Sequence, residues 1–273
     1  MIEIIFLICL GLIWIIFATI QDLKTKEVAN WLSFSLVIFA LGFRFFYCLF
    51  SRGDFNFFYQ GLIGLGIFLV VGNLLYYGRM FAGGDAKLMI ALGTILPLSE
   101  TFMVNLKIFV WFFVIFLFTG AIYGLVVSGV LAFRNFEKFK KEFSRQLKKN
   151  KKLVLSVFCV GIFIMILGFV EKLFIISGAL IFLFPYFYLS AKSIEKTCMI
   201  KKIKTSQLRE GDWLSHNLKI GNKFIKASWE GVSKEDIRRI KKKYKQVEIK
   251  QGIAFVPVFL ISFLALIMLN RFV

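Results

Sequence analysis

Long uninterrupted apolar segments dominate this sequence and leave few folds open to it. A hydrocarbon core of about 30 Å takes roughly 20 helical residues to cross. Segments of that order cover residues 2–20, 31–50, 57–77, 104–133, 153–170, 173–190 and 253–271. Inside lipid the backbone has no water to bond, so each segment is expected to be a helix. With 59% hydrophobic and only 19% charged residues in a chain of 273, the sequence predicts an integral membrane protein.

An eighth apolar segment begins at Asp85, within RMFAGGDAKLMIALGTIL. It is short, because Pro97 is expected to kink or end the helix. The first apolar segment lacks the basic start and the small-residue cleavage site of a signal peptide, so it is expected to be retained. The predicted fold class is an all-α polytopic membrane protein with about eight transmembrane helices and a small cytoplasmic α+β domain.

The basic residues predict an orientation in the cell membrane. Of 35 Lys and Arg, nine lie in 134–152 and seventeen in 191–252. Threading eight helices alternately puts both stretches on one side, and basic loops favour the cytoplasm. We therefore expect a multi-pass protein with both termini outside and with Asp22 and Asp85 at the cytoplasmic side. Anionic membrane lipids are the expected partner of the basic residues, and no nucleic acid is expected.

Two polar stretches divide the chain into five expected segments. Phe136, Phe139 and Phe143 recur at helical spacing among basic residues, which is typical of an amphipathic interfacial helix; a solvated charged linker is the alternative. In 191–252 we expect short strands, a hairpin turn at Gly221-Asn222, a helix with Ser233 and Asp236 at capping-box spacing, and a last strand QVEIK. The segments are membrane helices with both aspartates (1–133), a basic amphipathic segment (134–152), a transmembrane hairpin (153–190), a cytoplasmic α+β domain (191–252) and a last transmembrane helix (253–273).

The two acids at helix ends on one side of the membrane are the candidate catalytic residues. If Asp22 and Asp85 meet, they cannot both ionise comfortably and the pair holds a shared proton. An ionised carboxylate then activates water while the protonated one polarises a peptide carbonyl, which is aspartic protease chemistry. Gly83 and Gly84 lack a Cβ, so the loop before Asp85 is expected to take φ > 0 or to let a substrate strand come close.

Other interpretations of these residues remain open at this point. Asp85 after two glycines is also typical of a helix N-cap, with Asp22 as an acid that stays in water. In a transporter, Asp22, Asp85 and Arg44 would line a path, although Arg44 is expected to snorkel outward or to pair with a neighbour. A scaffold protein would leave both acids dispensable. The four cysteines form no CxxC pair, so we expect no metal site, and no cofactor is expected.

The two aspartate motifs carry a family resemblance. DLKTKEVANW at the end of the first span and AGGDAKLMIALG at Asp85, with QGIAFVPVFLISFLALI before the last helix, resemble the archaeal branch of the type IV prepilin peptidases. That branch includes the preflagellin peptidases and belongs to the GxGD membrane aspartic proteases. The resemblance covers roughly half the chain. Ala82 stands where the family has its first motif glycine, and Ala29 where a proline is common.

The resemblance implies an enzyme, an aspartic endopeptidase of the prepilin peptidase type. Asp22 and Asp85 are then catalytic, Gly83 and Gly84 form the active-site loop, and the substrate is the short basic leader of type IV prepilins or pilin-like proteins, or of preflagellins. Bacterial relatives add a cysteine-rich zinc module and also methylate the product. This sequence shows neither that module nor a glycine-rich cofactor loop, so the resemblance implies peptidase activity alone. The extra hairpin 153–190 exceeds the six-span core of preflagellin peptidases and favours prepilin-like substrates.

Overall fold

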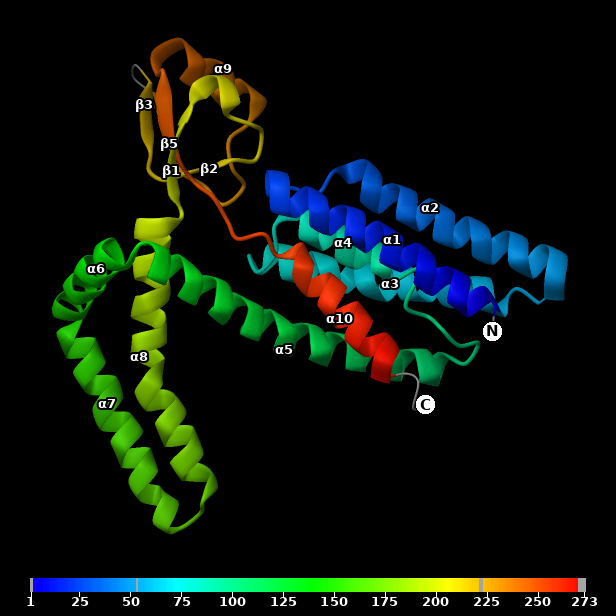
Figure 1. The fold of residues 1–273 in the computed structure, drawn as a ribbon, viewed down its shortest axis with the longest axis horizontal. Coiled ribbons are helices and arrows are strands. Elements are labelled where there is room, and N and C mark those ends of the chain that lie inside the picture. Colours follow the sequence, from blue (N-terminus) through cyan, green and yellow to red (C-terminus); the bar gives the residue numbers. More distant parts are fainter. Residues whose placement is uncertain (1, 53, 221–222, 270–273) are drawn as a thin grey trace. The chain divides into compact units, whose positions relative to one another are not determined.

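The computed structural model describes residues 2–52, 54–220 and 223–269, and most of them are helical (Figure 1). The α-helices are α1 (Ile2–Thr25), α2 (Asn30–Tyr47), α3 (Asn56–Tyr77), α4 (Gly83–Leu92), α5 (Phe102–Arg134), α6 (Phe136–Lys149), α7 (Lys151–Ile166), α8 (Leu173–Cys198), α9 (Lys234–Lys243) and α10 (Val256–Leu269). The strands are β1 (Ile200–Lys204), β2 (Trp213–Leu214), β3 (Leu218–Ile220), β4 (Lys223–Ile225) and β5 (Gln246–Lys250).

The chain forms two compact units. The first unit comprises residues 1–124 together with 253–273, and the second comprises residues 125–252. The first therefore contains α1 to α4, most of α5, and α10. Its core holds apolar side chains from all of these helices, among them Leu7, Leu36, Phe68, Phe112 and Phe259.

Within the described residues, six helices are long and apolar enough to cross a membrane: Ile2–Thr25, Asn30–Ser51, Asn56–Tyr77, Phe102–Arg134, Lys151–Phe169 and Leu173–Cys198. The expected count of eight is not confirmed, because α10 has 14 residues and α4 has 10. The expectation that Pro97 ends α4 is wrong. The helix already ends at Leu92, and tight backbone turns follow over Gly93 to Leu96.

Close backbone contact holds α4 against α3. A Cβ on Gly64 of α3 would lie 2.1 Å from the carbonyl oxygen of Gly93, and a Cβ on Gly93 would lie 2.5 Å from the carbonyl oxygen of Gly64. Only residues without a side chain permit such an approach. The short α4 is therefore fixed at its C-terminal end by a shape match with α3.

Arg44 of α2 fixes the turn after α4 from the other side. Its guanidinium donates hydrogen bonds to the carbonyl oxygens of Thr94 (3.0 Å), Phe57 (2.8 Å) and Pro97 (2.5 Å), and lies 4.3 Å from the Phe57 ring centroid. The side chain is fully buried. Of the two expectations for Arg44, bonding to neighbours is confirmed and outward snorkelling is wrong. A planar fork of donors can satisfy several carbonyls at once, and here it ties α2, α3 and the end of α4 together.

The second unit combines the antiparallel hairpin of α7 and α8 with a small α/β module. A three-stranded antiparallel sheet has the order β1-β5-β2, and β3 pairs with β4. Ser233 and Asp236 form the predicted capping box at the start of α9, and Ile237 and Ile240 of that helix are buried. The predicted last strand is confirmed as β5. The strands expected from residue 191 onward begin only at Ile200, because α8 continues to Cys198.

The expected turn at Gly221-Asn222 lies outside the described residues, although the strands on either side of it pair as predicted, with Ile220 opposite Lys223.

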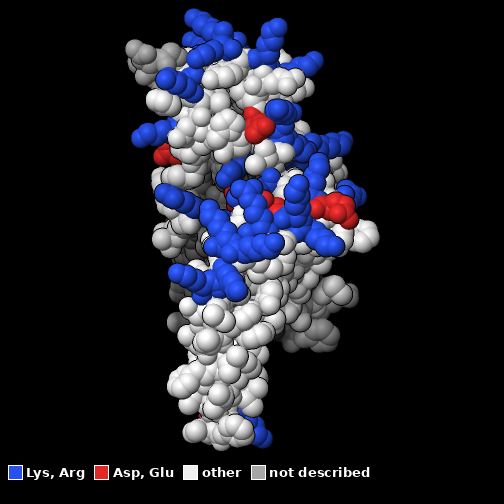
Figure 2. Space-filling model, turned by 90° about the vertical axis from the view of Figure 1, so that its left-hand side faces the viewer, with Lys and Arg blue, Asp and Glu red and all other residues white. Residues whose placement is uncertain are grey.

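Helix α6 packs beside α8 in the second unit and is strongly basic. Glu142 of α6 accepts a hydrogen bond from Gln146 (2.6 Å) and lies 3.3 Å from the ammonium group of Lys196 on α8. These two contacts hold the pKa of Glu142 below its usual value. Lys138, Lys141 and Arg145 line the same shallow hollow. In Figure 2 the Lys and Arg side chains gather here and over the α/β module, whereas most of the α7–α8 hairpin carries none.

Candidate active site

Asp22 lies near the C-terminal end of α1 and is buried, with 5% of its surface exposed. The interpretation of Asp22 as an acid that stays in water did not predict this. Burying a carboxylate is costly unless it is hydrogen-bonded. Asp22 has such a bond, since the backbone N–H of Val256 donates to its Oδ2 atom at 3.0 Å.

Val256 is the first residue of α10, and its N–H is one of the groups that a helix leaves without an internal partner. The Asp22 carboxylate supplies that partner and places a negative charge at the positive end of the helix dipole. The segment QGIAFVPVF noted in the sequence therefore brings its backbone to the first aspartate.

Asp85 is the third residue of α4 and is partly exposed. The N-cap of α4 is Ala82, so the interpretation of Asp85 as an N-cap is wrong. From the third position its carboxylate reaches back to the backbone N–H of Ala82. This is one half of a capping box.

The two glycines before Asp85 form the first turn of α4. Positive φ angles among the glycines of the described residues occur at Gly211 and Gly231 and not at Gly83 or Gly84, so the expectation of φ > 0 in this loop is wrong. A Cβ on Gly84 would lie 3.3 Å from both the Cβ and the backbone nitrogen of Val28, whereas one on Gly83 would meet only Tyr76, at 3.8 Å. Gly84 thus lets α4 approach the loop that follows α1.

That contact brings the two aspartates into one site. Lys87 of α4 donates a hydrogen bond of 2.7 Å to the side-chain oxygen of Asn30, which fastens the start of α4 to the start of α2. As a result the negative charges of Asp22 and Asp85 act on one another. Two acids separated by 63 positions in the sequence thus lie in one region of the first unit, among α1, α4 and the start of α10.

Tyr123 of α5 is a site residue that sequence reasoning missed. Its hydroxyl donates a hydrogen bond of 2.8 Å to the carbonyl oxygen of Ala254, and the charge of Asp22 acts on it. A tyrosine in a helix of this apolar composition is an ordinary interfacial residue, so nothing in the local pattern marks it. Only the fold shows that it holds the segment from which Val256 reaches Asp22.

In the described part of the chain, no group of three or more His, Cys, Asp or Glu side chains is arranged to hold a metal ion.

The comparisons with known proteins concern this part of the chain. The model of the type IV leader peptidase family matches residues 9–128, a range that contains both aspartates. A preflagellin peptidase of Methanococcus voltae is 27% identical over 156 residues, which are 54% of this chain and 64% of that protein. A preflagellin peptidase of Methanococcus maripaludis is 25% identical over 133 residues, 46% of this chain and 57% of that protein.

A third relative is a preflagellin peptidase of Methanocaldococcus jannaschii, 31% identical over 87 residues, which are 32% of this chain and 36% of that protein. The chain thus spans less than two thirds of the length of each of these curated relatives. No solved structure matches it significantly. The resemblance predicted from the aspartate motifs is confirmed to this extent: residues 9–128 of this chain are similar to the type IV leader peptidase family, and the three relatives named above are preflagellin peptidases.

Proposed function

We propose that this chain is a membrane aspartic endopeptidase that removes the short basic leader peptide of type IV prepilins or pilin-like proteins at the cytoplasmic face of the membrane. The observation that carries the proposal is the approach of Asp22 and Asp85 from two separate helices, within the range that matches a leader peptidase family. Both acids belong to the membrane helices 1–133, which we propose as the catalytic part of the chain.

In the proposed reaction the two carboxyl groups share one proton. The ionised group takes a proton from a water molecule while the water oxygen forms a bond to the carbonyl carbon of the scissile peptide. The protonated group donates a hydrogen bond to the carbonyl oxygen and stabilises its growing negative charge. The C–N bond then breaks, and a proton passes from the carboxyl pair to the leaving amine.

The backbone around the pair is suited to keep the two acids in place. Asp22 is held by the N–H of Val256 and Asp85 by the N–H of Ala82. A carboxylate has about four acceptor sites, so each is left with acceptor capacity for water or substrate. A group held in this way does not need to reorganise when the reaction begins.

We further propose that α6 lies at the cytoplasmic membrane surface, as the interfacial segment 134–152, with both chain termini outside. Four cations surround Glu142, namely Lys138, Lys141, Arg145 and Lys196, so the cluster keeps an excess of positive charge. The adjoining hairpin of α7 and α8 exposes apolar side chains along its length. A basic group beside an apolar hairpin fits anionic lipid head groups next to acyl chains.

Preflagellins are the alternative substrates, and they are favoured by the three relatives, each of which is a preflagellin peptidase. The preference for prepilin-like substrates rests on the α7–α8 hairpin, which the sequence places beyond a six-span core, whereas the described residues contain six long apolar helices with that hairpin included. Co-expression of the full chain with a prepilin and, separately, with a preflagellin distinguishes them. Leader removal appears as a mobility shift on a gel, and the substrate class that is processed decides between the two.

The central experiment replaces each acid in turn. Asp22→Asn and Asp85→Asn are each expected to lower leader cleavage by at least about a thousandfold, because an amide cannot take the proton from water. Asp54→Asn is the matched control, since Asp54 is an exposed acid of the same unit, beside Asn56 at the start of α3. Full activity in either of the first two variants would refute the proposed carboxyl pair.

A further inference from the structure

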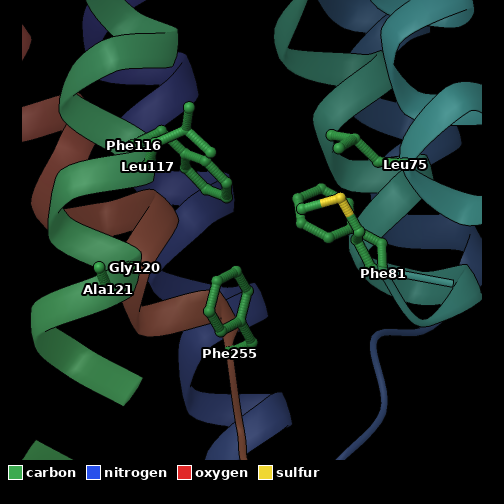
Figure 3. Close-up of a pocket in the computed structure, with 8 residues that line it drawn as sticks. Leu75, Phe81, Phe116, Leu117, Gly120, Ala121 and Phe255 are labelled. Atoms are coloured by element: carbon green, nitrogen blue, oxygen red, sulfur yellow. The ribbon is translucent and has the colours of Figure 1, made fainter. Parts of the chain in front are cut away.

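A basic hollow of about 430 Å³ lies in the second unit, between α6 and the end of α8. It differs from the pocket in Figure 3, whose walls are apolar throughout and offer no partner to a charged ligand. Besides Thr197, four cations and one acid line the hollow, namely Lys138, Lys141, Arg145, Lys196 and Glu142. The cations outnumber the acid by three, so the hollow attracts anions.

The acid of the hollow holds two of the cations and leaves the other two free for a ligand. Glu142 lies 3.3 Å from the ammonium group of Lys196 and 3.5 Å from the guanidinium of Arg145. Lys138 and Lys141 are exposed, and the part of the chain that the structure describes gives neither of them an acidic partner. They lie three positions apart and so share one face of α6, where their ammonium groups keep their donors for an anion.

The end of α8 indicates the depth of the hollow in the membrane. Tyr186 and Tyr188 expose 39% and 49% of their surface, and exposed tyrosines of membrane helices gather at the level of the lipid head groups. The ammonium group of Lys192 lies 5.6 Å from the centre of the Tyr188 ring. Lys196 follows one turn later, and a helical side chain leans toward the start of its helix. The cations of the hollow are therefore within reach of lipid phosphates.

The α7–α8 hairpin beside the hollow offers a surface for acyl chains. Leu155 of α7 and Phe184 and Phe187 of α8 are all more than half exposed. In Figure 2 the hairpin is uncharged over most of its length and the basic side chains gather at one end of it. A molecule that joins a phosphate to long apolar chains fits both surfaces.

From these contacts we propose that the hollow binds the phosphate group of one anionic phospholipid, whose acyl chains lie along the α7–α8 hairpin. The inference rests on the proposed placement of α6 at the membrane surface. It goes beyond that placement, because it assigns one lipid molecule to one set of residues. It does not depend on the carboxyl pair or on the substrate.

The test compares two variants of the full-length protein that lose the same charge. Lys138→Gln combined with Lys141→Gln removes the two unpaired cations of the hollow. Lys140→Gln combined with Lys152→Gln is the matched control, because both lysines are exposed and neither lines the hollow. A diffuse attraction between basic residues and anionic lipid weakens equally in the two variants, whereas a defined site weakens only in the first.

Native mass spectrometry in a neutral detergent measures the binding of dioleoylphosphatidylglycerol. The wild-type protein is expected to retain one molecule of this lipid at concentrations where it retains no dioleoylphosphatidylcholine, which has no net charge. The first variant should lose about tenfold or more in affinity, as the removal of two basic contacts allows, and the control less than about twofold. Glycerol phosphate should compete poorly, because it lacks the acyl chains.

Four outcomes would overturn the inference. A wild-type protein that retains no phosphatidylglycerol has no such site, and equal losses in the two variants would indicate a diffuse basic surface. Equal retention of phosphatidylcholine would indicate a purely apolar contact, and strong competition by glycerol phosphate a site for soluble anions. The readout needs no cleavage, so its failure is distinct from a failure to remove leaders, which would contradict the proposed peptidase function.

Discussion

The backbone N–H of Val256 donates a hydrogen bond of 3.0 Å to the carboxylate of Asp22, which lies 234 residues earlier in the chain. The bond joins the end of the first helix to the start of the last one. Asp22 therefore has a structural task, the capping of α10, besides the chemical task that we propose for it. The two tasks can be separated by substitution.

Asp22→Asn and Asp22→Ala should differ in stability although both abolish cleavage. The amide oxygen of Asn can still accept the bond from Val256, whereas Ala leaves that N–H without its partner. We expect Ala to cost about 1 kcal/mol more than Asn, as for loss of a helix cap. Thermal unfolding of the purified protein in detergent measures the difference, and equal melting of the two variants would argue against the capping role.

Gly84→Ala should impair cleavage far more than Gly83→Ala. The new methyl group at position 84 meets Val28 at 3.3 Å, and the one at position 83 meets only Tyr76 at 3.8 Å. Because a small displacement of a reacting group can cost about a hundredfold in rate, we expect a tenfold to hundredfold loss for Gly84→Ala. Activity per folded molecule is the quantity to compare; a lower folded yield with normal specific activity would mean that Gly84 serves folding alone.

Tyr123→Phe should slow catalysis without removing it. The change deletes the hydroxyl that binds the Ala254 carbonyl and loosens the segment that leads to Val256. We expect about 1 kcal/mol of lost stability and a several-fold fall in kcat with little change in KM. Tyr77→Phe is the control, since Tyr77 is 69% exposed. An unchanged kcat in Tyr123→Phe would mean that this tyrosine does not position the site.

Arg44→Met should destabilise the first unit. It replaces the guanidinium by an apolar chain and leaves the carbonyl oxygens of Thr94, Phe57 and Pro97 without their donor. Each unsatisfied buried acceptor costs about 1 to 3 kcal/mol, so the loss should exceed about 2 kcal/mol. Arg44→Lys should recover only part of it, because one ammonium group lacks the planar fork. Denaturation of the detergent-solubilised protein tests both variants.

The proposed orientation predicts a labelling pattern. In a variant without the four native cysteines, a cysteine at Ser144 in α6 or at Ser228 in the α/β module should resist an impermeant thiol reagent in intact cells. A cysteine at Ser51 should react, because the charge asymmetry puts that loop outside. Labelling at Ser144 from outside the cell would reverse the orientation and the proposed side of the active site.

Local patterns predicted local structure well. The spacing of Phe139 and Phe143 marked α6, and the Ser233–Asp236 pair marked the start of α9, because each pattern is complete within one turn of helix. Asp22 and Asp85 could also be singled out as candidates from the sequence, since two acids at the ends of apolar helices stand out and their flanking motifs resemble a family.

The missed features all depend on partners far along the chain. Arg44 bonds to carbonyl oxygens 50 and 53 residues away, and Tyr123 to one 131 residues away. A side chain that binds backbone carbonyls has no complementary side chain elsewhere in the sequence. The contact therefore cannot be predicted from residue types. For the same reason the sequence suggests that Gly84 is needed for its own backbone freedom. The structure instead shows that a glycine is needed at this position because of its close approach to Val28.

The bond between Asp22 and Val256 also bears on the order in which the molecule is made. A growing chain makes α1 and α4 long before it reaches Val256, which lies 234 residues after Asp22. Until then the first acid lacks the backbone group that holds it in the finished structure. Under the proposed peptidase function, a newly synthesised molecule is therefore expected to stay inactive until α10 is in place, so that unfinished copies do not cut the proteins inserted beside them.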